Sequence, residues 1–191
     1  MHTPADSMLA YLRAKDGNRP HLMAQAFTRD ATLSVRLHTD GIVFPPFTQG
    51  REAIGDLLAR RFGQVNENVY TFCLTAPPLS RPAAVDCDWL VAMSNKDDGD
   101  VRVGCGRYDW RFAADSGLAE RLRIDIDVMS VLPPSALDGV MAWVRALPYP
   151  WCPAATALAG APEWAALAAA RAYLEGDSGR ERMRSEMRSG N

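Results

Sequence analysis

The fold of this chain is decided by residues 84–133, which read AVDCDWLVAMSNKDDGDVRVGCGRYDWRFAADSGLAERLRIDIDVMSVLP. Side chains two residues apart in a strand point to the same face of a sheet. In the first third, apolar side chains recur at every second position: Val85, Cys87, Trp89, Val91 and Met93. Asp98-Gly99 and Asp115-Ser116-Gly117 are turns typical of hairpins. The stretch therefore predicts three consecutive antiparallel strands with one apolar and one charged face.

The two turns also predict which residues face each other. A two-residue turn at Asp98-Gly99 places Met93 opposite Gly104, Val91 opposite Gly106, Trp89 opposite Tyr108, Cys87 opposite Trp110 and Asp86 opposite Arg111. A three-residue turn ending in Gly117 places Trp110 opposite Leu122, Tyr108 opposite Ile124, Gly106 opposite Ile126, Asp109 opposite Arg123 and Arg107 opposite Asp125. A slip of one residue would mix the two faces, so the apolar alternation specifies the register.

The composition indicates one globular domain and excludes several classes of protein. The chain has 191 residues, 48% of them hydrophobic, which is enough for a sizeable core. A formal charge of −2 predicts no general attraction to nucleic acid. No apolar run is long enough to cross a bilayer, and the N-terminus lacks a signal-peptide pattern. Because the four cysteines show no CxxC spacing, we expect reduced thiols and a cytoplasmic location.

The remaining segments predict helices on both sides of this sheet. Upstream we expect a helix that begins at the Thr3 cap, a second from Pro20, a strand over residues 31–38, a helix over 51–62 and a short strand over 69–74. Downstream, Ser135 and Asp138 form the pattern of a capping box for a helix through residue 147. A proline-rich connector over 148–153 and a helix over 162–174 follow, and residues 177–191 are polar and rich in arginine.

The order of these elements, with helices before a run of antiparallel strands, is an α+β pattern. Together with Tyr11, FTRDAT at 27–32, GREAI at 50–54 and GRYDWRF at 106–112, it resembles the NTF2-like superfamily. This is the cone-shaped fold of ketosteroid isomerases, SnoaL-like polyketide cyclases and scytalone dehydratases. The resemblance covers about residues 4–134. It implies an NTF2-like cone domain over residues 1–134, in which N-terminal helices pack on a curved antiparallel sheet. Residues 135–176 would add a C-terminal helical extension to the same domain, and 177–191 a polar tail.

The resemblance also implies an apolar pocket between the concave sheet face and the first helices. Its expected lining is Tyr11, Phe27, Val35, Leu37, Trp89, Val91, Tyr108, Trp110, Ile124 and Ile126. The alternative is that these side chains simply fill the core, as aromatic residues on an apolar face often do. On the convex face, Arg107, Asp109, Arg123 and Asp125 are interpreted as an ion-pair ladder without chemistry. The same convex face is the expected surface of a homodimer.

Catalytic residues carry over only in part. By the resemblance, Tyr11 matches the donor tyrosine of ketosteroid isomerases, and Tyr108 stands where the second donor, a protonated carboxyl group, would be. Val35 stands in place of the base and cannot move a proton, which speaks against the isomerase mechanism. Two phenols could still hold a carbonyl group or a water. The candidates for a proton carrier are His38 and Asp40, although strand alternation directs His38 away from the apolar face unless a bulge re-aims it.

Two functions of different class follow. The first is a lyase or isomerase for a small, oxygenated, apolar molecule, with Tyr11 and Tyr108 as donors and His38 or Asp40 as proton carrier. The second is a non-catalytic dimeric module that binds a ligand or a partner chain in the cone. We expect no metal and no cofactor, because metal-ligand spacing and phosphate-binding glycine loops are missing from the sequence.

Overall fold

The computed structural model describes residues 2–176; the predicted polar tail, residues 177–191, lies outside them. The helices are α1 (Pro4–Asp16), α2 (Arg51–Gly55), α3 (Phe62–Val65), α4 (Leu137–Arg145), α5 (Ala154–Gly160) and α6 (Ala168–Leu174). The strands are β1 (Phe27–Leu37), β2 (Phe47–Gln49), β3 (Asn66–Cys73), β4 (Ala84–Asn95), β5 (Val101–Phe112) and β6 (Ala119–Leu132). Three 3-10 turns, η1 (Pro20–Gln25), η3 (Pro134–Ala136) and η4 (Ala165–Leu167), and a π-helical segment, η2 (Asp56–Arg61), complete the described elements.

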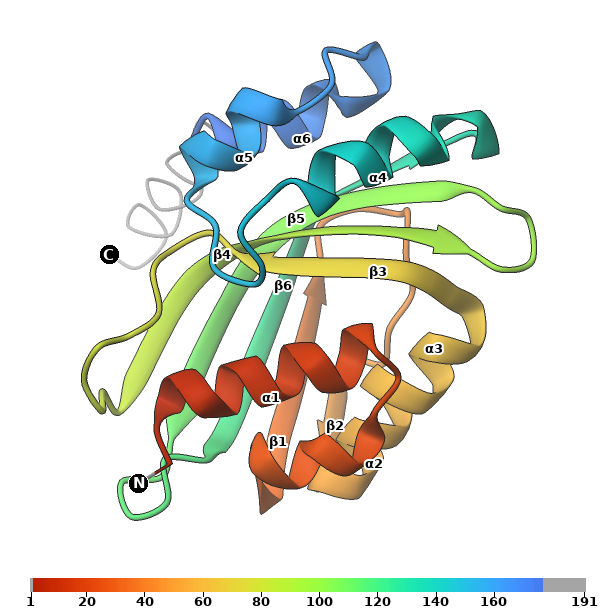
Figure 1. The fold of residues 1–191 in the computed structure, drawn as a ribbon. Coiled ribbons are helices and arrows are strands. Elements are labelled where there is room, and N and C mark those ends of the chain that lie inside the picture. The colour runs from red at the N-terminus through yellow and green to blue at the C-terminus, as the bar shows by residue number, and fades with distance from the viewer. Residues whose placement is uncertain (1, 177–191) are drawn as a thin grey trace, which may run out of the picture.

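The six strands form one strongly curved sheet in the order β2-β1-β6-β5-β4-β3. Figure 1 shows α1, α2 and α3 on one side of this sheet and α4, α5 and α6 on the other. The predicted α+β class is confirmed, but the sheet is mixed rather than purely antiparallel, because β1 runs parallel to β6. No hairpin joins these two strands, so nothing in the local sequence sets their relative direction. Among the described residues, no helix has the length and apolar character that crossing a bilayer requires.

The predicted register between β5 and β6 is confirmed. Trp110 lies opposite Leu122, Tyr108 opposite Ile124 and Gly106 opposite Ile126, and Asp109 and Arg123 face each other on the other side of the sheet with an ion pair of 3.4 Å. Arg107 is likewise opposite Asp125, although its guanidinium pairs with Asp88 on β4 at 3.3 Å. The pairing is interrupted at Asp127, because Gly106 pairs with Ile126 while Cys105 pairs with Val128.

The predicted register between β4 and β5 is wrong by two residues. Trp89 lies opposite Gly106 and Val91 opposite Gly104, because the connecting loop contains four residues instead of two. The backbone N–H of Asn95 donates to the carbonyl of Asp100 at 2.8 Å and closes this longer loop. A shift of two residues leaves every side chain on its predicted face. Asp86 therefore lies opposite Asp109 and not opposite Arg111 as predicted. The Arg111 guanidinium nevertheless forms an ion pair of 3.6 Å with Asp86, diagonally across the two strands.

The first helix of the chain begins where the sequence predicts, whereas the first helix after the sheet does not. Thr3 forms a complete capping box with Asp6 at the start of α1. Ser135 makes no capping hydrogen bond, and the chain instead enters α4 through the 3-10 turn at Pro134–Ala136. The helix predicted over residues 162–174 is regular only in α6, and α5 precedes it. The helix predicted over 51–62 is present but contains the π-helical segment, which widens the turn just before Phe62.

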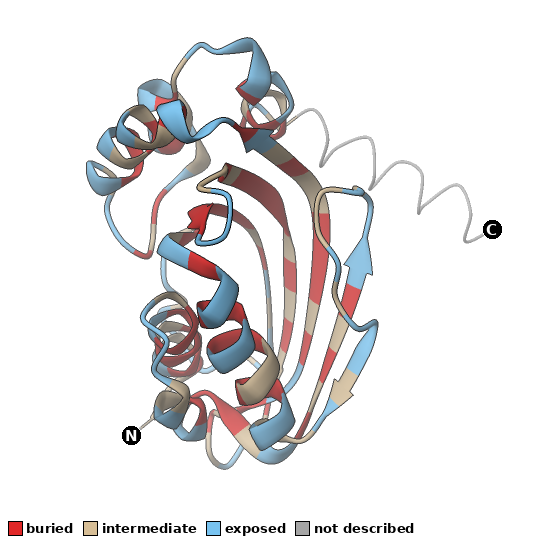
Figure 2. Cartoon of the chain, turned by 90° about the vertical axis from the view of Figure 1, so that its right-hand side faces the viewer, coloured by how far each residue is buried: buried red, intermediate tan, exposed pale blue. Residues whose placement is uncertain are grey.

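Two apolar cores lie on opposite faces of the sheet. The concave core joins α1, α2 and α3 to the predicted apolar face of β4, β5 and β6. The second core joins α4, α5 and α6 to Leu90, Ala92, Val103 and Cys105 of the opposite face. Figure 2 shows buried residues on the strands and on the sheet-facing sides of the helices. The convex face is therefore charged over only part of its area, and the C-terminal helices cover the rest.

Candidate functional site

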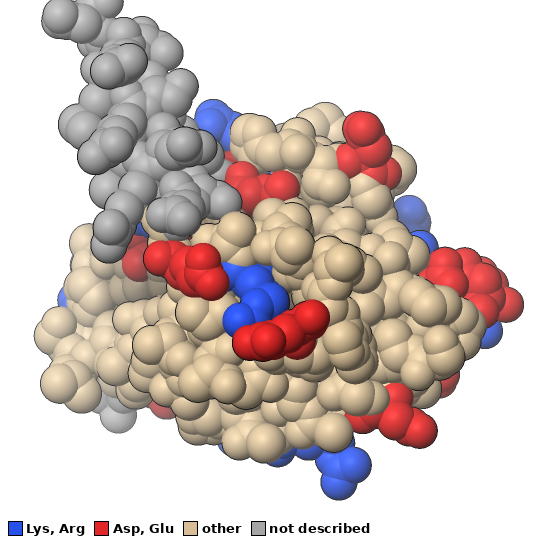
Figure 3. Space-filling model, turned by 90° about the horizontal axis from the view of Figure 1, so that it is seen from above, with Lys and Arg blue, Asp and Glu red and all other residues tan. Residues whose placement is uncertain are grey.

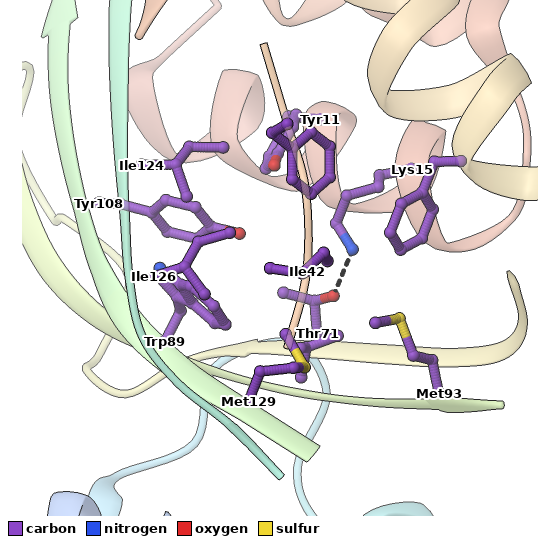
Figure 4. Close-up of a pocket in the computed structure, with 13 residues that line it drawn as sticks. Tyr11, Lys15, Ile42, Thr71, Trp89, Met93, Tyr108, Ile124, Ile126 and Met129 are labelled. Atoms are coloured by element: carbon purple, nitrogen blue, oxygen red, sulfur yellow. Dashed lines mark hydrogen bonds between the residues drawn. The ribbon is translucent and has the colours of Figure 1, made fainter. Parts of the chain in front are cut away.

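A cavity of about 50 Å³ lies inside the cone, between the concave sheet face and the N-terminal helices (Figure 4). Its lining is mainly apolar and comes from α1, α3, four strands and the loop between β1 and β2. The lining residues are Tyr11, Lys15, Ile42, Phe44, Phe62, Thr71, Trp89, Val91, Met93, Tyr108, Ile124, Ile126 and Met129. The polar groups of this set are two phenols, one ammonium group, one hydroxyl group and the indole N–H of Trp89, which is buried without a hydrogen-bond partner among the described residues.

Tyr11 and Tyr108 bring two phenols together in the cavity wall. Tyr11 comes from α1 and Tyr108 from β5, and both are almost fully buried. Their rings meet edge to face with centroids 5.9 Å apart. Burial raises the pKa of both phenols above the usual range, so both stay protonated. Protonated phenols in the cavity wall can donate hydrogen bonds to a ligand.

Lys15 is the lining residue that the sequence reasoning missed. It lies one helical turn after Tyr11, so both side chains project from the same side of α1. Its Nζ donates to Asp16 Oδ1 at 2.8 Å and to Thr71 Oγ1 at 2.6 Å, and lies 4.8 Å from the centre of the Phe62 ring. The side chain is only 7% exposed. Its spacing in the sequence could have revealed it: Lys15 follows Tyr11 by four residues, on the helix face that also carries Met8 and Leu12.

Asp16 fixes the position of this ammonium group. Its carboxylate accepts hydrogen bonds from the backbone N–H and the hydroxyl of Thr71, both at 2.8 Å, in addition to the bond from Lys15. It also accepts a hydrogen bond of 3.1 Å from the Tyr149 hydroxyl, which belongs to the connector after α4. A buried charge is stabilised when it is paired and hydrogen-bonded in this way. The Lys15–Asp16 pair is therefore electrically neutral as a unit and rigidly held.

The proton-carrier candidates His38 and Asp40 lie outside the cavity. The His38 side chain is 49% exposed and lies 4.0 Å from Asp127, and Asp40 is exposed in the following loop. Among the expected pocket residues, the structure places Trp89, Val91, Ile124 and Ile126 in the cavity wall. It places Phe27, Val35 and Trp110 in the concave core away from the cavity, and Leu37 is 38% exposed.

The chemistry available in the cavity is hydrogen-bond donation. Phenols that stay protonated donate, and so does an ammonium group. The lining contains no carboxylate and no imidazole, so no conventional proton acceptor faces a ligand. Among residues 2–176, no cluster of three or more His, Cys, Asp or Glu side chains could hold a metal ion.

Comparisons with known proteins identify the fold. No protein-family model matches the chain, and no curated protein matches it. Many solved structures, however, resemble the structure of this chain. A protein with a ketosteroid isomerase-like fold from Catenulispora acidiphila, in complex with trimethylamine, superposes with a TM-score of 0.50 at 18% identity, covering 64% of this chain and 85% of that one. An NTF2-like protein from Burkholderia thailandensis gives 0.52 at 15% identity, covering 66% and 92%.

A third solved structure, a hexachlorocyclohexane dehydrochlorinase, gives a TM-score of 0.50 at 16% identity, covering 66% of this chain and 84% of that one. At such identities the likeness concerns the backbone arrangement and not the chemistry. The likeness extends over about two thirds of this chain. The chain therefore has the NTF2-like cone fold.

Proposed function

We propose that the cone binds one small molecule with an apolar body and a hydrogen-bond acceptor, and that it does so without converting it. The observation that carries this proposal is the lining of the cavity: apolar side chains surround the donors Tyr11, Tyr108 and Lys15, and no conventional proton acceptor faces inward. Apolar walls with a few polar groups that fix orientation are the usual design of small-molecule sites.

The cavity volume limits the size of the ligand. An apolar cavity of about 150 Å³ accommodates benzene, which has six non-hydrogen atoms, so by proportion about 50 Å³ suits a molecule of roughly two non-hydrogen atoms. Larger ligands need side chains to move. Met93 and Met129 border the cavity, and their unbranched side chains adapt readily to a new shape. Ile42 and Phe44 close it from the loop between β1 and β2.

Catalysis as a lyase or isomerase on a small oxygenated molecule is the alternative function. Its support is the pair of neighbouring phenols, which could polarise a carbonyl group. It requires a group that takes up a proton close to the ligand. The sequence candidates for that role, His38 and Asp40, are both outside the cavity, which favours the binding module.

We further propose that the protein is a cytoplasmic homodimer that pairs through the uncovered part of the convex face. Arg107, Arg111 and Arg123 alternate there with Asp86, Asp88 and Asp109 in ion pairs of 2.7–3.6 Å. Such a surface can complement a second copy of itself. The cysteines, all buried and unpaired, suit a reducing compartment. The surface on the side of the C-terminal helices, seen in Figure 3, is by contrast largely uncharged where it is visible.

Binding can be tested by titrating small ketones, amides and alkenes into the isotope-labelled protein and following backbone amide shifts. We expect saturable shifts at Tyr11, Trp89 and Tyr108 in the wild type. Tyr108→Phe and Tyr11→Phe should each weaken the affinity for a ketone about fivefold, the effect of losing a hydrogen bond worth about 1 kcal/mol. Tyr70→Phe, on the other face of the sheet, is the control. Unchanged affinity in both cavity variants would exclude the phenols from binding, and turnover of a ligand would favour the enzyme.

A further inference from the structure

We propose that the ligand of this cavity is uncharged, and that Lys15 holds it through its third N–H. The inference rests on the proposed function and goes beyond it, because it specifies the chemical class of the ligand as a neutral acceptor such as a carbonyl or nitrile group. It follows from the number of donors on Lys15 and from the balance of charge around the cavity.

The donor count leaves Lys15 one N–H for a ligand. An ammonium group has three N–H donors. Two of them are used by Asp16 at 2.8 Å and Thr71 at 2.6 Å. The third has no oxygen partner within the described residues, although the side chain lines the cavity together with Tyr108. Figure 4 shows the Lys15 nitrogen and the Tyr108 hydroxyl group pointing toward the interior of the same space.

The charge balance excludes an anion. The negative charge of Asp16 already compensates the positive charge of Lys15, and the two side chains are equally buried. No other lining residue carries a charge, because the rest are apolar side chains, two phenols and one threonine. A bound carboxylate would thus leave one negative charge uncompensated in an apolar enclosure, which is strongly unfavourable. A neutral acceptor leaves the sum of charges at zero.

A purely apolar ligand fits less well than a neutral acceptor. It would cover the third N–H of Lys15 and offer it no acceptor, and a buried donor without a partner carries a desolvation cost. The cation–π contact with Phe62 at 4.8 Å compensates only one side of the ammonium group. The structure therefore favours a ligand with an oxygen or nitrogen acceptor and no formal charge. An alkene lacks the acceptor, and a carboxylate carries a charge.

Three probes of nearly equal shape separate these possibilities. Acetone, acetate and 2-methylpropene each have four non-hydrogen atoms around a trigonal carbon, so all three need the same enlargement of the cavity by movement of Met93 or Met129. Titrations followed by amide shifts give their affinities. We expect acetone to bind about tenfold tighter than acetate, and more tightly than 2-methylpropene. Acetate binding as tightly as acetone overturns the inference, and so does 2-methylpropene binding as tightly as acetone; both leave the proposed function intact. Saturable binding of none of the three contradicts the proposed function itself.

A charge variant provides the second test. Asp16→Asn removes the compensating charge, so the cavity gains one net positive charge and should then prefer acetate to acetone by about tenfold. Asp86→Asn changes the net charge of the protein equally on the convex face and should leave the preference for acetone unchanged. An Asp16→Asn protein that folds and still rejects acetate overturns the inference. If Asp16→Asn does not fold, the three wild-type affinities decide alone.

Discussion

Gly106 in β5 allows the indole of Trp89 to lie across the neighbouring strand. A Cβ at this position would come 2.6 Å from the Trp89 ring and even closer to the backbone carbonyl of Asp125. The carbonyl belongs to β6 and cannot move without disturbing the sheet. We expect Gly106→Ala to lower the free energy of unfolding by about 3 kcal/mol, as measured by chemical denaturation. Gly55→Ala is the control, because its Cβ would meet only the flexible Met23 side chain, at 3.3 Å. Equal effects of the two substitutions would contradict this account.

The buried phenols make the stability of the protein sensitive to alkaline pH. Burial raises the pKa of Tyr11 and of Tyr108, whereas in the unfolded chain both titrate near pH 10. Their contribution is therefore complete below about pH 10 and is lost as the pH rises, because the unfolded state then releases protons that the folded state retains. We expect Tm to fall more steeply above pH 10 in the wild type than in Tyr108→Phe. Parallel Tm curves for the two proteins would show that Tyr108 does not contribute.

The burial of Lys15 in the cavity wall was not predicted from the sequence. Strand alternation correctly placed Tyr108, Trp89 and Ile124 on the concave face, because a period of two leaves only two choices. A lysine on a helix has more freedom, since its long side chain can reach water from a partly covered position. Its burial depends on Thr71, which is 56 residues away in the sequence and approaches Lys15 only in the folded chain.

At the level of single elements, two similar sequence patterns should differ in their effect on stability. Thr3 accepts a hydrogen bond from the backbone N–H of Asp6 at 3.2 Å, and Asp6 Oδ2 in turn accepts one from the backbone N–H of Thr3 at 2.9 Å. Ser135 makes no corresponding bond at α4. We expect Thr3→Ala to cost about 1 kcal/mol in the free energy of unfolding and Ser135→Ala almost nothing. A larger effect at Ser135 than at Thr3 would disprove this assignment of the cap.

The two hairpins show how far turn sequences specify strands. Gly117, with φ of +73°, is left-handed, but its loop contains four residues and not the predicted three, because the backbone N–H of Ala113 donates to the carbonyl of Leu118 at 2.9 Å. A bulge between Arg111 and Phe112 offsets the extra residue and restores the predicted register of β5 and β6. Gly99 is also left-handed, with φ of +75°, at the end of a four-residue loop, and no bulge follows it between β4 and β5. Asp98-Gly99 fits both loop lengths, and the apolar alternation tolerates a shift of two residues. The apolar alternation therefore determines which face of the sheet each β4 side chain occupies, but not which β5 residue lies opposite it.

Across the whole molecule, Tyr149 connects the C-terminal extension to the cavity. Its hydroxyl donates to Asp16, the same carboxylate that orients Lys15. We expect Tyr149→Phe to lower the free energy of unfolding by about 1 kcal/mol and to weaken ligand binding, because Asp16 loses one of its hydrogen bonds. Chemical denaturation and the acetone titration measure the two effects. Tyr70→Phe is the matched control, since the Tyr70 ring packs edge to face on Tyr149. Loss of stability without any change in affinity would limit Tyr149 to a structural role.

The position of the C-terminal helices was not predicted, although the sequence contains a signal for it. Residues 89–93 of β4 are apolar at every position, not only at alternate ones, which is typical of a strand covered on both faces. Leu90 and Ala92 are indeed fully buried beneath the C-terminal helices. What the sequence could not show is which segment covers them. The apolar stripes of α4 and α6 would fit another copy of the chain equally well.

The connector after α4 has a consequence for the behaviour of the protein at high concentration. β3 is an outer strand of the sheet, and its unpaired backbone groups would otherwise invite strand addition from another molecule. The connector covers the end of this edge: Cys73 donates its N–H to the carbonyl of Pro150 at 2.8 Å and accepts a hydrogen bond from the N–H of Cys152 at 3.0 Å. The opposite edge strand is β2, only three residues long. An added strand would therefore meet the connector at the end of β3 and only a short partner at β2, so we expect the folded protein to resist edge-to-edge aggregation.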